Sequence, residues 1–359
     1  MDFGLSEEQR LLEETVTRFL DEQLPVPRVR EIVESESGVD PDAWRGLAEL
    51  GVAGCLVPEE YGGAGLSLLD AAVIATALGH GAAPVPFLSS SVLAALLLKE
   101  AGTDGLRTEW LPKIADGTAR LAVAVAEQVE ARQDASLRLD AGRLSGTALF
   151  VLDGLDADGV LVPLGDDVLW VPKGTAGFAA KPLATIDRTR RVAELHFDGV
   201  APADVCRGGA AALGRVLDAA RVIDAADILG GCDRALALSV EYAGDRKQFG
   251  RPIATFQAVK HLCAEMAATL EPARSLVWYA AHAWDALPEE SPLVATLCKA
   301  HLAETGQDLL RIAVQVHGGI GFTDECDLQL WFKRVGLSRQ LLGGPAKLRD
   351  HAARLQGLA

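Results

Sequence analysis

Residues 241–257 read EYAGDRKQFGRPIATFQ and connect two long segments in which apolar residues recur with a helical period. The chain carries four such segments from residue 210 onward: 210–243, 254–286, 292–316 and 326–357. Helices of this length are stabilised mainly by packing against one another. The pattern therefore predicts a C-terminal four-helix bundle over residues 205–359, with residues 245–253 as the turn between its first two helices.

The residues before the bundle have a different pattern. Short alternating apolar runs are separated by turns that contain Asp, Gly and Lys, as is typical of β-strands. The runs are 121–125, 149–152, 160–162, 168–171 and 192–197. They predict a small antiparallel β domain over residues 118–204.

The first 117 residues predict a helical domain. Ser6–Gln9 has the spacing of a capping box at a helix start, Asp40–Pro41 begins a second helix, and Ser67 precedes a third. A further helix is expected over residues 91–98. The fold class is thus α+β and mostly α, with a helical domain over residues 1–117, the β domain next and the bundle last.

The charge balance argues against two classes of partner. The 359 residues include 34 Lys plus Arg and 50 Asp plus Glu, which gives a formal net charge of −16. Nucleic acids and anionic membranes both favour a basic surface, so neither is expected as a partner. The longest apolar runs, such as residues 92–98, are too short to cross a bilayer. The first residues contain neither the basic nor the apolar region of a signal peptide, and the expected location is cytoplasmic.

The six cysteines and seven histidines do not indicate a metal site. The cysteines are scattered without a CxxC pair, and the histidines form no HExxH or HxH motif. Zinc sites and disulfide frameworks both have characteristic spacings that are absent here. We therefore expect reduced, mostly buried thiols and no metal.

Two segments contain residue types suited to ligand binding. In residues 245–253, Arg246, Gln248 and Phe249 precede a helix start, where an arginine and the helix N-terminus favour an anion and an aromatic ring can stack. A simple interhelical turn would explain the same residues. Residues 315–323 carry three glycines in four positions at a helix end, which permits close approach of a ligand, whereas a helix C-cap needs only one glycine.

These segments, with three others nearer the N-terminus, resemble motifs of the acyl-CoA dehydrogenase family. The C-terminal motifs are EYAGDRKQFGRPIATFQ and QVHGGIGFTDE, and the N-terminal ones are FGLSEEQ, WRGLAELGVAGCLVPEEYGGAGLS and WLPKIADGTARLAVA. The resemblance covers the whole chain and implies the same three-part fold. It also implies FAD as the cofactor, an acyl-CoA as the substrate and electron-transfer flavoprotein as a partner. In the family a carboxylate removes the α-proton of the substrate while the β-hydride passes to flavin N5.

The resemblance also implies which residues bind FAD. In the family, the Arg-Lys-Gln-Phe-Gly loop and the Gln-x-x-Gly-Gly turn reach across a dimer interface and hold the pyrophosphate and adenosine of the neighbouring subunit's FAD. The matching positions in this chain are Arg246, Gln248, Phe249, Gln257, Gln315, Gly318 and Gly319.

The chain departs from the family at the catalytic base. The family's glutamate usually lies in a Tyr-Glu-Gly-Thr stretch, seven residues before an arginine, and counting back from Arg349 gives Leu342. A shifted alignment does not supply a base, because no Asp or Glu occurs between Leu328 and Arg349. Some members carry the glutamate just before an arginine on the first bundle helix, and that position is Ala220 here. Neither side chain can accept a proton, so no catalytic residue is predicted at either position.

Two acids lie near Ala220, and two segments of the chain correspond to the family's flavin-ring motifs. Asp218 should point to a different helix face from Ala220, and Asp224 lies one turn further along. The family's Thr-Glu-Pro-x-x-Gly-Ser-Asp loop, which donates hydrogen bonds to the flavin, corresponds to residues 126–132, where the hydroxyl, the Pro and the Gly-Ser are absent. The Trp-x-Thr/Ser strand that packs on the flavin ring appears as residues 150–152, Phe-Val-Leu, without the hydroxyl.

Three functions follow as hypotheses. The favoured one resembles the base-less subunit of actinobacterial α2β2 acyl-CoA dehydrogenases that act on sterol side-chain CoA esters. Such a subunit completes the FAD site of a homologous partner that carries the base. The second is a homomeric flavoenzyme whose base is Asp224, Glu241 or a group on the substrate. The third is a non-catalytic assembly protein that keeps the fold for its bundle interface.

Overall fold

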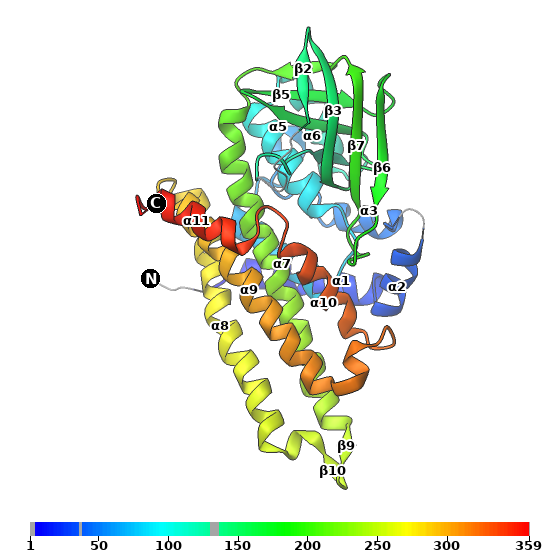
Figure 1. The fold of residues 1–359 in the computed structure, drawn as a ribbon, viewed down its shortest axis with the longest axis vertical. Helices are drawn as coiled ribbons and strands as arrows, with labels where there is room; N and C mark the ends of the chain where they lie inside the picture. Colours follow the sequence, from blue (N-terminus) through cyan, green and yellow to red (C-terminus); the bar gives the residue numbers. More distant parts are fainter. Residues whose placement is uncertain (1–3, 36–37, 130–135, 359) are drawn as a thin grey trace.

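The computed structural model describes residues 4–35, 38–129 and 136–358. Helices come first along the chain, β-sheets follow, and long helices form the C-terminal part (Figure 1). The predicted order of helical domain, β domain and helical bundle is confirmed.

Three of the N-terminal helices begin at the predicted caps, Ser6, Asp40 and Ser67. The bounds of the N-terminal helices are α1 Glu7–Gln23, α2 Val26–Glu34, α3 Pro41–Glu49, η1 Glu59–Tyr61, α4 Leu68–His80, η2 Phe87–Ala94, α5 Ala95–Ala101 and α6 Asp104–Ala115. Ser6 and Ser67 each form a capping box, and the Asp40 carboxylate accepts hydrogen bonds from the first turn of α3. The helix expected over residues 91–98 consists of the π-helical segment η2 and the start of α5.

The middle strands form two four-stranded sheets. The strands are β1 Leu121–Val123, β2 Arg138–Asp140, β3 Arg143–Leu152, β4 Gly159–Leu164, β5 Asp167–Pro172, β6 Phe178–Leu183, β7 Val192–Val200 and β8 Asp204–Cys206. One sheet has the order β1-β4-β5-β8 and the other β2-β3-β7-β6. Among the described strands of these two sheets the pairs are antiparallel, as predicted, except for β1 and β4, which are parallel.

The C-terminal helices surround the long helix α7. Their bounds are α7 Ala210–Asp245, α8 Gln257–Ala286, α9 Ser291–His317, α10 Leu328–Ser338 and α11 Pro345–Leu355. Short elements lie between them: β9 Lys247–Gln248, β10 Arg251–Pro252, η3 Ile253–Thr255 and η4 Gly318–Phe322. The prediction of one helix over residues 326–357 is wrong, because Leu342 and Gly343 have φ angles of 59° and 107° and interrupt it between α10 and α11.

Helices α4 and α7 cross with their backbones in contact. A Cβ atom at Gly79 would lie 2.1 Å from the carbonyl oxygen of Asp227, and one at Gly230 would lie 1.9 Å from that of Thr76. Only glycine allows this separation. The indole Nε1 of Trp331 on α10 donates to the Gly79 carbonyl oxygen at 3.1 Å, so a third helix is joined to the crossing.

Buried charges next to this crossing connect four segments of the chain. Asp224 and Asp227 lie on α7, Lys299 on α9, Arg334 on α10 and Arg190 between β6 and β7. Lys299 Nζ lies 2.8 Å from Asp224, while Arg334 Nη2 and Arg190 Nη2 lie 2.6 and 2.9 Å from Asp227. Arg190 Nη1 also lies 3.2 Å from Asp224. Desolvation alone would raise the pKa of Asp227, but the two arginines more than offset it and hold that pKa below its ordinary value.

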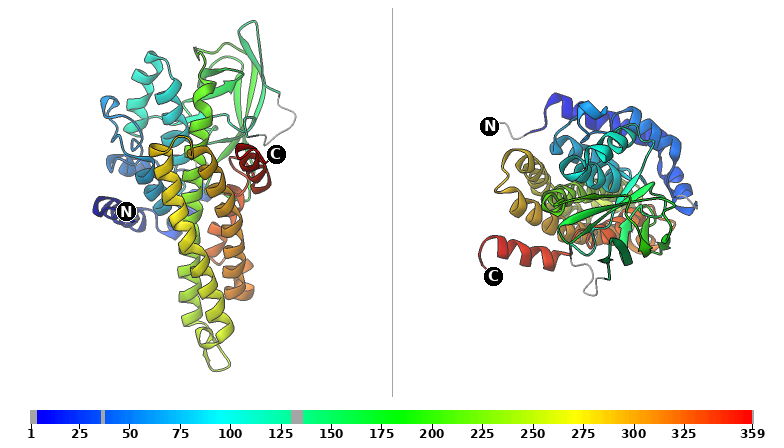
Figure 2. Two further views of the ribbon diagram at one scale, coloured as in Figure 1. Left: turned by 90° about the vertical axis from the view of Figure 1, so that its left-hand side faces the viewer. Right: turned by 90° about the horizontal axis from the view of Figure 1, so that it is seen from above.

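The molecule is elongated along the bundle. The left view of Figure 2 shows α7 and α8 extending away from the β domain, with the β9–β10 hairpin at their far end. Within the described ranges, no helix has both the length and the hydropathy needed to span a bilayer. Within the same ranges, no group of three or more His, Cys, Asp or Glu side chains has the arrangement of a metal site.

The buried charge cluster yields a stability prediction. Asp227→Ala leaves Arg190 and Arg334 without their shared anion, and we expect the free energy of unfolding to fall by about 3–5 kcal/mol. Denaturant unfolding measures this loss. The control is Asp308→Ala, since the exposed pair of Asp308 with Arg311 at 2.9 Å should contribute less than about 1 kcal/mol. Equal losses in the two variants would contradict the assigned structural role.

Candidate functional site

A cavity of about 590 Å³ lies between the β domain, η2 and the turn that joins α10 to α11. Aliphatic side chains form most of its wall, among them Leu93 of η2, Val123 of β1, Leu152 of β3 and Leu342 of the turn. Its volume is in the range of pockets that bury small-molecule ligands. The cavity is therefore the first candidate for a binding site in this chain.

Leu342, at the usual position of the family's base, lies in the wall of this cavity. Its side chain is 4% exposed, and its φ of 59° is rare for a residue other than glycine. Arg221 of α7 donates from Nε to the Leu342 carbonyl oxygen at 3.3 Å and so holds the turn against the bundle. Of the described residues that line the cavity, none is an aspartate or a glutamate.

The alternative bases do not face the cavity. Ala220 is fully buried within α7. Asp218 is buried and pairs with Arg221 at 2.9 Å, while Asp224 is fully buried between Lys299 and Arg190. A carboxylate held by two cations in the core is a structural group, and this geometry argues against Asp224 as a base.

Glu241, the remaining acid named as a possible base, is exposed near the C-terminal end of α7. Twenty residues of helix separate it from Arg221, which corresponds to about 30 Å at 1.5 Å per residue. Since Arg221 marks the cavity end of α7, Glu241 cannot reach the cavity of its own chain.

The predicted flavin-ring positions also lie in the cavity wall. Ala126 and Val129 come from the loop after β1, of which residues 130–132 lie outside the described part of the chain. Phe150 and Leu152 come from β3. Phe150 is 46% exposed and has a φ of 56°, at an irregularity in the pairing of β3 with β7. Ala126 and Leu152 thus present hydrocarbon side chains at positions where the family's motifs have hydroxyl groups.

The cavity has one buried hydroxyl group in its described wall, that of Ser89 in η2. This hydroxyl donates to the carboxylate of Asp153 in the turn after β3, so its proton is already engaged. A flavin ring carries several polar nitrogen and oxygen atoms, and burying them without hydrogen bonds is costly. At the predicted flavin-ring positions, the described side chains therefore do not fit a flavin ring.

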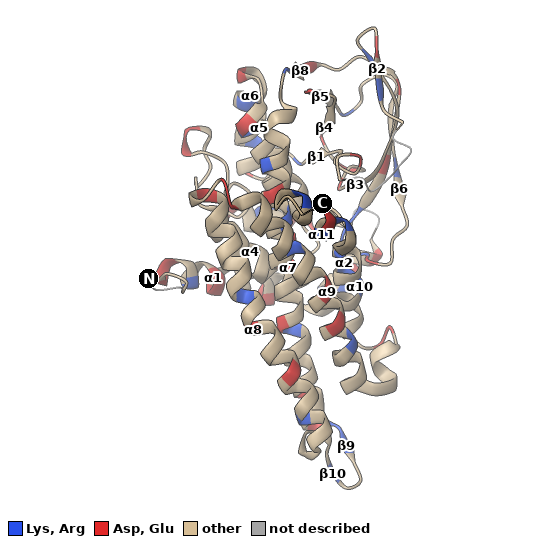
Figure 3. Ribbon diagram, turned by 60° about the vertical axis from the view of Figure 1, so that its left-hand side comes forward, with Lys and Arg blue, Asp and Glu red and all other residues tan. Residues whose placement is uncertain are grey.

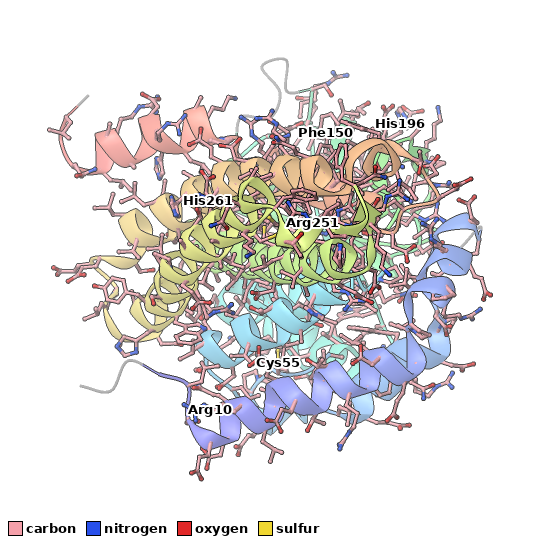
Figure 4. The ribbon with its side chains drawn as sticks, turned by 90° about the horizontal axis from the view of Figure 1, so that it is seen from below. Arg10, Cys55, Phe150, His196, Arg251 and His261 are labelled. Carbon is pink, nitrogen blue, oxygen red and sulfur yellow. The ribbon has the colours of Figure 1, made fainter. Side chains whose placement is uncertain are left out.

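The residues assigned to FAD by resemblance lie at the far end of α7. Arg246, Gln248 and Phe249 belong to the β9–β10 hairpin at the end of the bundle (Figure 1), where all three are exposed. The Phe249 side chain is 91% exposed. Next to it in the hairpin, the Arg251 guanidinium lies 4.3 Å from the ring centroid of Phe256. Figure 3 shows basic residues along the ribbon of this hairpin, and Figure 4 looks along the bundle with Arg251 at its near end.

The glycine-rich turn lies beside the hairpin. Tyr242 of α7 stacks on His317 of α9 with ring centroids 4.6 Å apart, so the two helix ends meet. Gly318 follows with a φ of 66° and a ψ of −142°, a conformation that glycine alone adopts readily. At both Gly318 and Gly319, a Cβ atom would meet no heavy atom within 4 Å, so the backbone there is open to a ligand. Gln315 is exposed one turn earlier.

The structure brings the hairpin and the glycine-rich turn together but separates both from the cavity. From Arg221 to Arg246 there are 25 residues of α7, which corresponds to about 38 Å. In Figure 1 the β domain and the β9–β10 hairpin lie at opposite ends of the molecule. A site that uses both ends of α7 must therefore combine two chains.

Comparison with family models decides the identification. A model of the acyl-CoA dehydrogenase N-terminal domain matches residues 6–118, and one of the acyl-CoA dehydrogenase C-terminal domain matches residues 207–354. The chain belongs to the acyl-CoA dehydrogenase family. Members of this family are flavin-dependent oxidoreductases that act on CH–CH bonds.

Individual relatives give the same assignment over the whole length. Acyl-CoA dehydrogenase IpdE2 of Mycolicibacterium smegmatis is 36% identical, covering 98% of this chain and 99% of its own length. The ChsE4-ChsE5 complex from Mycobacterium tuberculosis contains a chain 28% identical to this one, with a TM-score of 0.90 and full coverage of both chains. A structure of the Tcur3481-Tcur3483 steroid ACAD has 31% identity and a TM-score of 0.88, covering 98% of each chain.

Sequence reasoning missed several features that shape the site. Ser89 lies in a run of three serines inside an apolar helix, a signal that could have marked an unusual helix next to a cavity. Arg221 follows Ala220, but its partner Leu342 is 121 positions away and cannot be identified from spacing. The positive φ angle of Phe150 has no signature in the sequence.

Asp218 gives a pH prediction. Desolvation raises its pKa to about 6, although Arg221 opposes the shift. Because the folded chain then binds a proton more tightly than the unfolded chain, stability should fall as pH rises from about 4 to about 6, by at most about 3 kcal/mol. Asp218→Asn should remove this part of the pH dependence. Denaturant unfolding at pH 4.5 and 7 measures it, and an unchanged pH dependence in the variant would contradict the assignment.

Proposed function

We propose that this chain is the base-less subunit of a heteromeric acyl-CoA dehydrogenase and that its hairpin end completes the FAD site of a homologous partner. The observation that carries the proposal is the cavity wall, where Leu342 stands in place of the base and no described lining residue is acidic. Without a base the α-proton of an acyl-CoA cannot be removed here. The partner is then the subunit that carries the catalytic glutamate.

The hairpin end has the groups that a dinucleotide needs. FAD, when bound, supplies the acceptor for the substrate hydride. Arg246 is exposed and can pair with a pyrophosphate, and Phe249 can stack on an adenine ring. Gly318 and Gly319 leave room for close approach, while Gln248, Gln257 and Gln315 offer amide hydrogen bonds. In this proposal all these groups serve the FAD bound by the partner, since the cavity of their own chain is about 38 Å away along α7.

The proposal extends to assembly and substrate. The two complexes among the similar structures each pair two different chains, and one is titled a steroid ACAD. We therefore assign this chain to an α2β2 heterotetramer with two FAD molecules, acting on a sterol side-chain CoA ester. Electron-transfer flavoprotein is the proposed electron acceptor.

Arg246 tests the binding role of the hairpin. Arg246→Ala should weaken FAD binding in the complex by about 1.5–3 kcal/mol, the range of a charge-assisted hydrogen bond, with an unchanged melting temperature of the apo complex. Flavin titration and thermal unfolding measure the two quantities. Arg45→Ala, at an exposed arginine of α3, is the control and should change neither. A stability loss with unchanged flavin affinity would show that Arg246 only supports the turn.

Leu342 tests the assignment of chemistry to the partner. With the partner's catalytic glutamate changed to glutamine, the complex should lose acyl-CoA dehydrogenation although this chain is intact. Leu342→Glu in this chain should not restore activity, because a base without an aligned hydride acceptor is ineffective. It should also lower stability more than Leu342→Gln, since an unpaired buried charge costs more than an amide. Activity that survives the partner's substitution would contradict the proposal and assign a working base to this chain.

A further inference from the structure

A second cavity, of about 220 Å³, lies between α2, the segment that joins β6 to β7, and the first half of α10. It shares no described lining residue with the cavity that contains Leu342. Its apolar wall is formed by Val33, Ile186 and Leu330. Ile186 is 65% exposed, so the cavity opens to solvent. A water molecule takes about 30 Å³ in the liquid, and the cavity therefore has room for a small organic molecule.

Asp187 contributes a carboxylate oxygen without a partner to this cavity. The residue lines the cavity and is 1% exposed. Its Oδ1 accepts hydrogen bonds from the backbone N–H of Thr189 at 2.8 Å and from the Thr189 hydroxyl at 2.7 Å. Its Oδ2 is buried and has no hydrogen-bond partner among the described residues. A buried carboxylate oxygen is costly unless a ligand or a water molecule donates a hydrogen bond to it.

The neighbouring arginines do not fully compensate this carboxylate. Arg334 donates from Nη1 to the Thr189 hydroxyl at 2.7 Å and so lies on the side of Oδ1. Both Arg334 and Arg190 are already paired with Asp227. Desolvation raises the pKa of Asp187 above its ordinary value, and the opposing charges of the two arginines do not cancel this rise. A further cation beside Oδ2 would stabilise the ionised form.

Gln329 of α10 offers a second acceptor, and the cationic side chains of the lining are occupied. The Gln329 side chain lines the same cavity, and its Oε1 is buried without a hydrogen-bond partner in the described part of the chain. The cationic side chains of the described lining each pair with a carboxylate: Arg188 with Glu34, Lys333 with Asp324 at 3.0 Å and Arg30 with Asp327 at 2.7 Å. An anion would have to compete with these carboxylates, whereas a cationic donor meets two open acceptors.

We propose that this cavity binds a small organic cation with a primary ammonium or guanidinium group. The N–H groups of the cation donate to Asp187 Oδ2 and Gln329 Oε1, and its short hydrocarbon part lies against the apolar wall. A hydrogen bond between a charged donor and a carboxylate is about twice as strong as a neutral one, so the charge of the ligand provides selectivity.

The bound cation connects three parts of the chain. Its contacts come from α2, from the segment between β6 and β7, and from α10. A ligand that binds only the folded arrangement of these parts stabilises it by mass action, so the chain responds to the concentration of the cation. The site contains neither the hairpin nor the position of the base, and it therefore does not depend on the proposed function.

The test titrates the purified chain with three probes of similar length. These are butylguanidinium, butylammonium and pentanamide, which is neutral but keeps two N–H donors. Ligand-observed NMR measures each dissociation constant. One of the two cations should bind at least tenfold more tightly than pentanamide, and the tighter cation identifies the preferred charged group. Pentanamide that binds as tightly as both cations, or no binding of either cation at millimolar concentration, would overturn the inference and leave water as the occupant of the cavity.

Two substitutions test the two acceptors. In Asp187→Asn the amide oxygen can keep the hydrogen bonds from Thr189, and the NH2 group then replaces Oδ2, so cation binding should weaken at least tenfold. Gln329→Leu, at a half-buried position, removes the second acceptor and should weaken binding about fivefold, the effect of about one neutral hydrogen bond. Asp308→Asn, at an exposed ion pair of α9, is the control and should leave binding unchanged.

Circular dichroism and thermal unfolding check that each variant folds. If Asp187→Asn does not fold, Gln329→Leu alone decides. Cation binding that is unchanged in every folded variant of these two would overturn the inference, because the cation would then bind elsewhere on the chain. Addition of the tighter cation should also raise the melting temperature of the wild-type chain more than that of the Gln329→Leu variant.

Discussion

The carboxylates of Asp224 and Asp227 fix the position of helix α7, and the rest of the structure is arranged around that helix. Each is buried and held by two cations from other elements, so α7 is joined to α9, to α10 and to the segment between β6 and β7. The glycine contact at Gly230 brings α4 into the same crossing. Because these contacts lie in the middle of a 36-residue helix, its two ends are held at a fixed separation.

Because the two ends of α7 are held at a fixed separation, the structures around them can have different roles. At one end Arg221 holds the turn that contains Leu342 against the cavity. At the other end the stack of Tyr242 on His317 brings the hairpin and the glycine-rich turn together. The cavity at the first end and the nucleotide-binding groups at the second end are too far apart to contact one FAD within a single chain. They can contact the same FAD only when two chains combine. Loss of the base at the first end therefore leaves the second end free to keep its role, which is the physical basis of the proposed division between subunits.

The sequence predicts the local features well, because they depend on neighbours in the chain. The capping boxes at Ser6 and Ser67 and the alternating runs of β3 and β7 are examples. It does not predict β2, β6 and β8, which are short or largely exposed and lack a clear apolar alternation. The break between α10 and α11 is also hidden, since Leu341 and Leu342 continue the apolar pattern through a turn.

The candidate site likewise has parts that the sequence predicts and parts that only the fold brings together. Motif resemblance identifies the hairpin residues, and counting back from Arg349 places Leu342 at a position that the structure puts in the cavity wall. Asp224 could be named as an alternative base from the sequence, but its partner Lys299 is 75 positions away and only the fold brings them together. The apolar cavity wall likewise arises from described residues of five separate segments and has no continuous signature.

The central claim is that this chain completes a partner's FAD site and binds no FAD in its own cavity. The most direct measurement is the number of FAD molecules per polypeptide in the purified complex of this chain with its homologous partner. The account predicts one FAD for every two chains, and little flavin in this chain expressed alone. A stable homotetramer of this chain with one FAD in every subunit would contradict it.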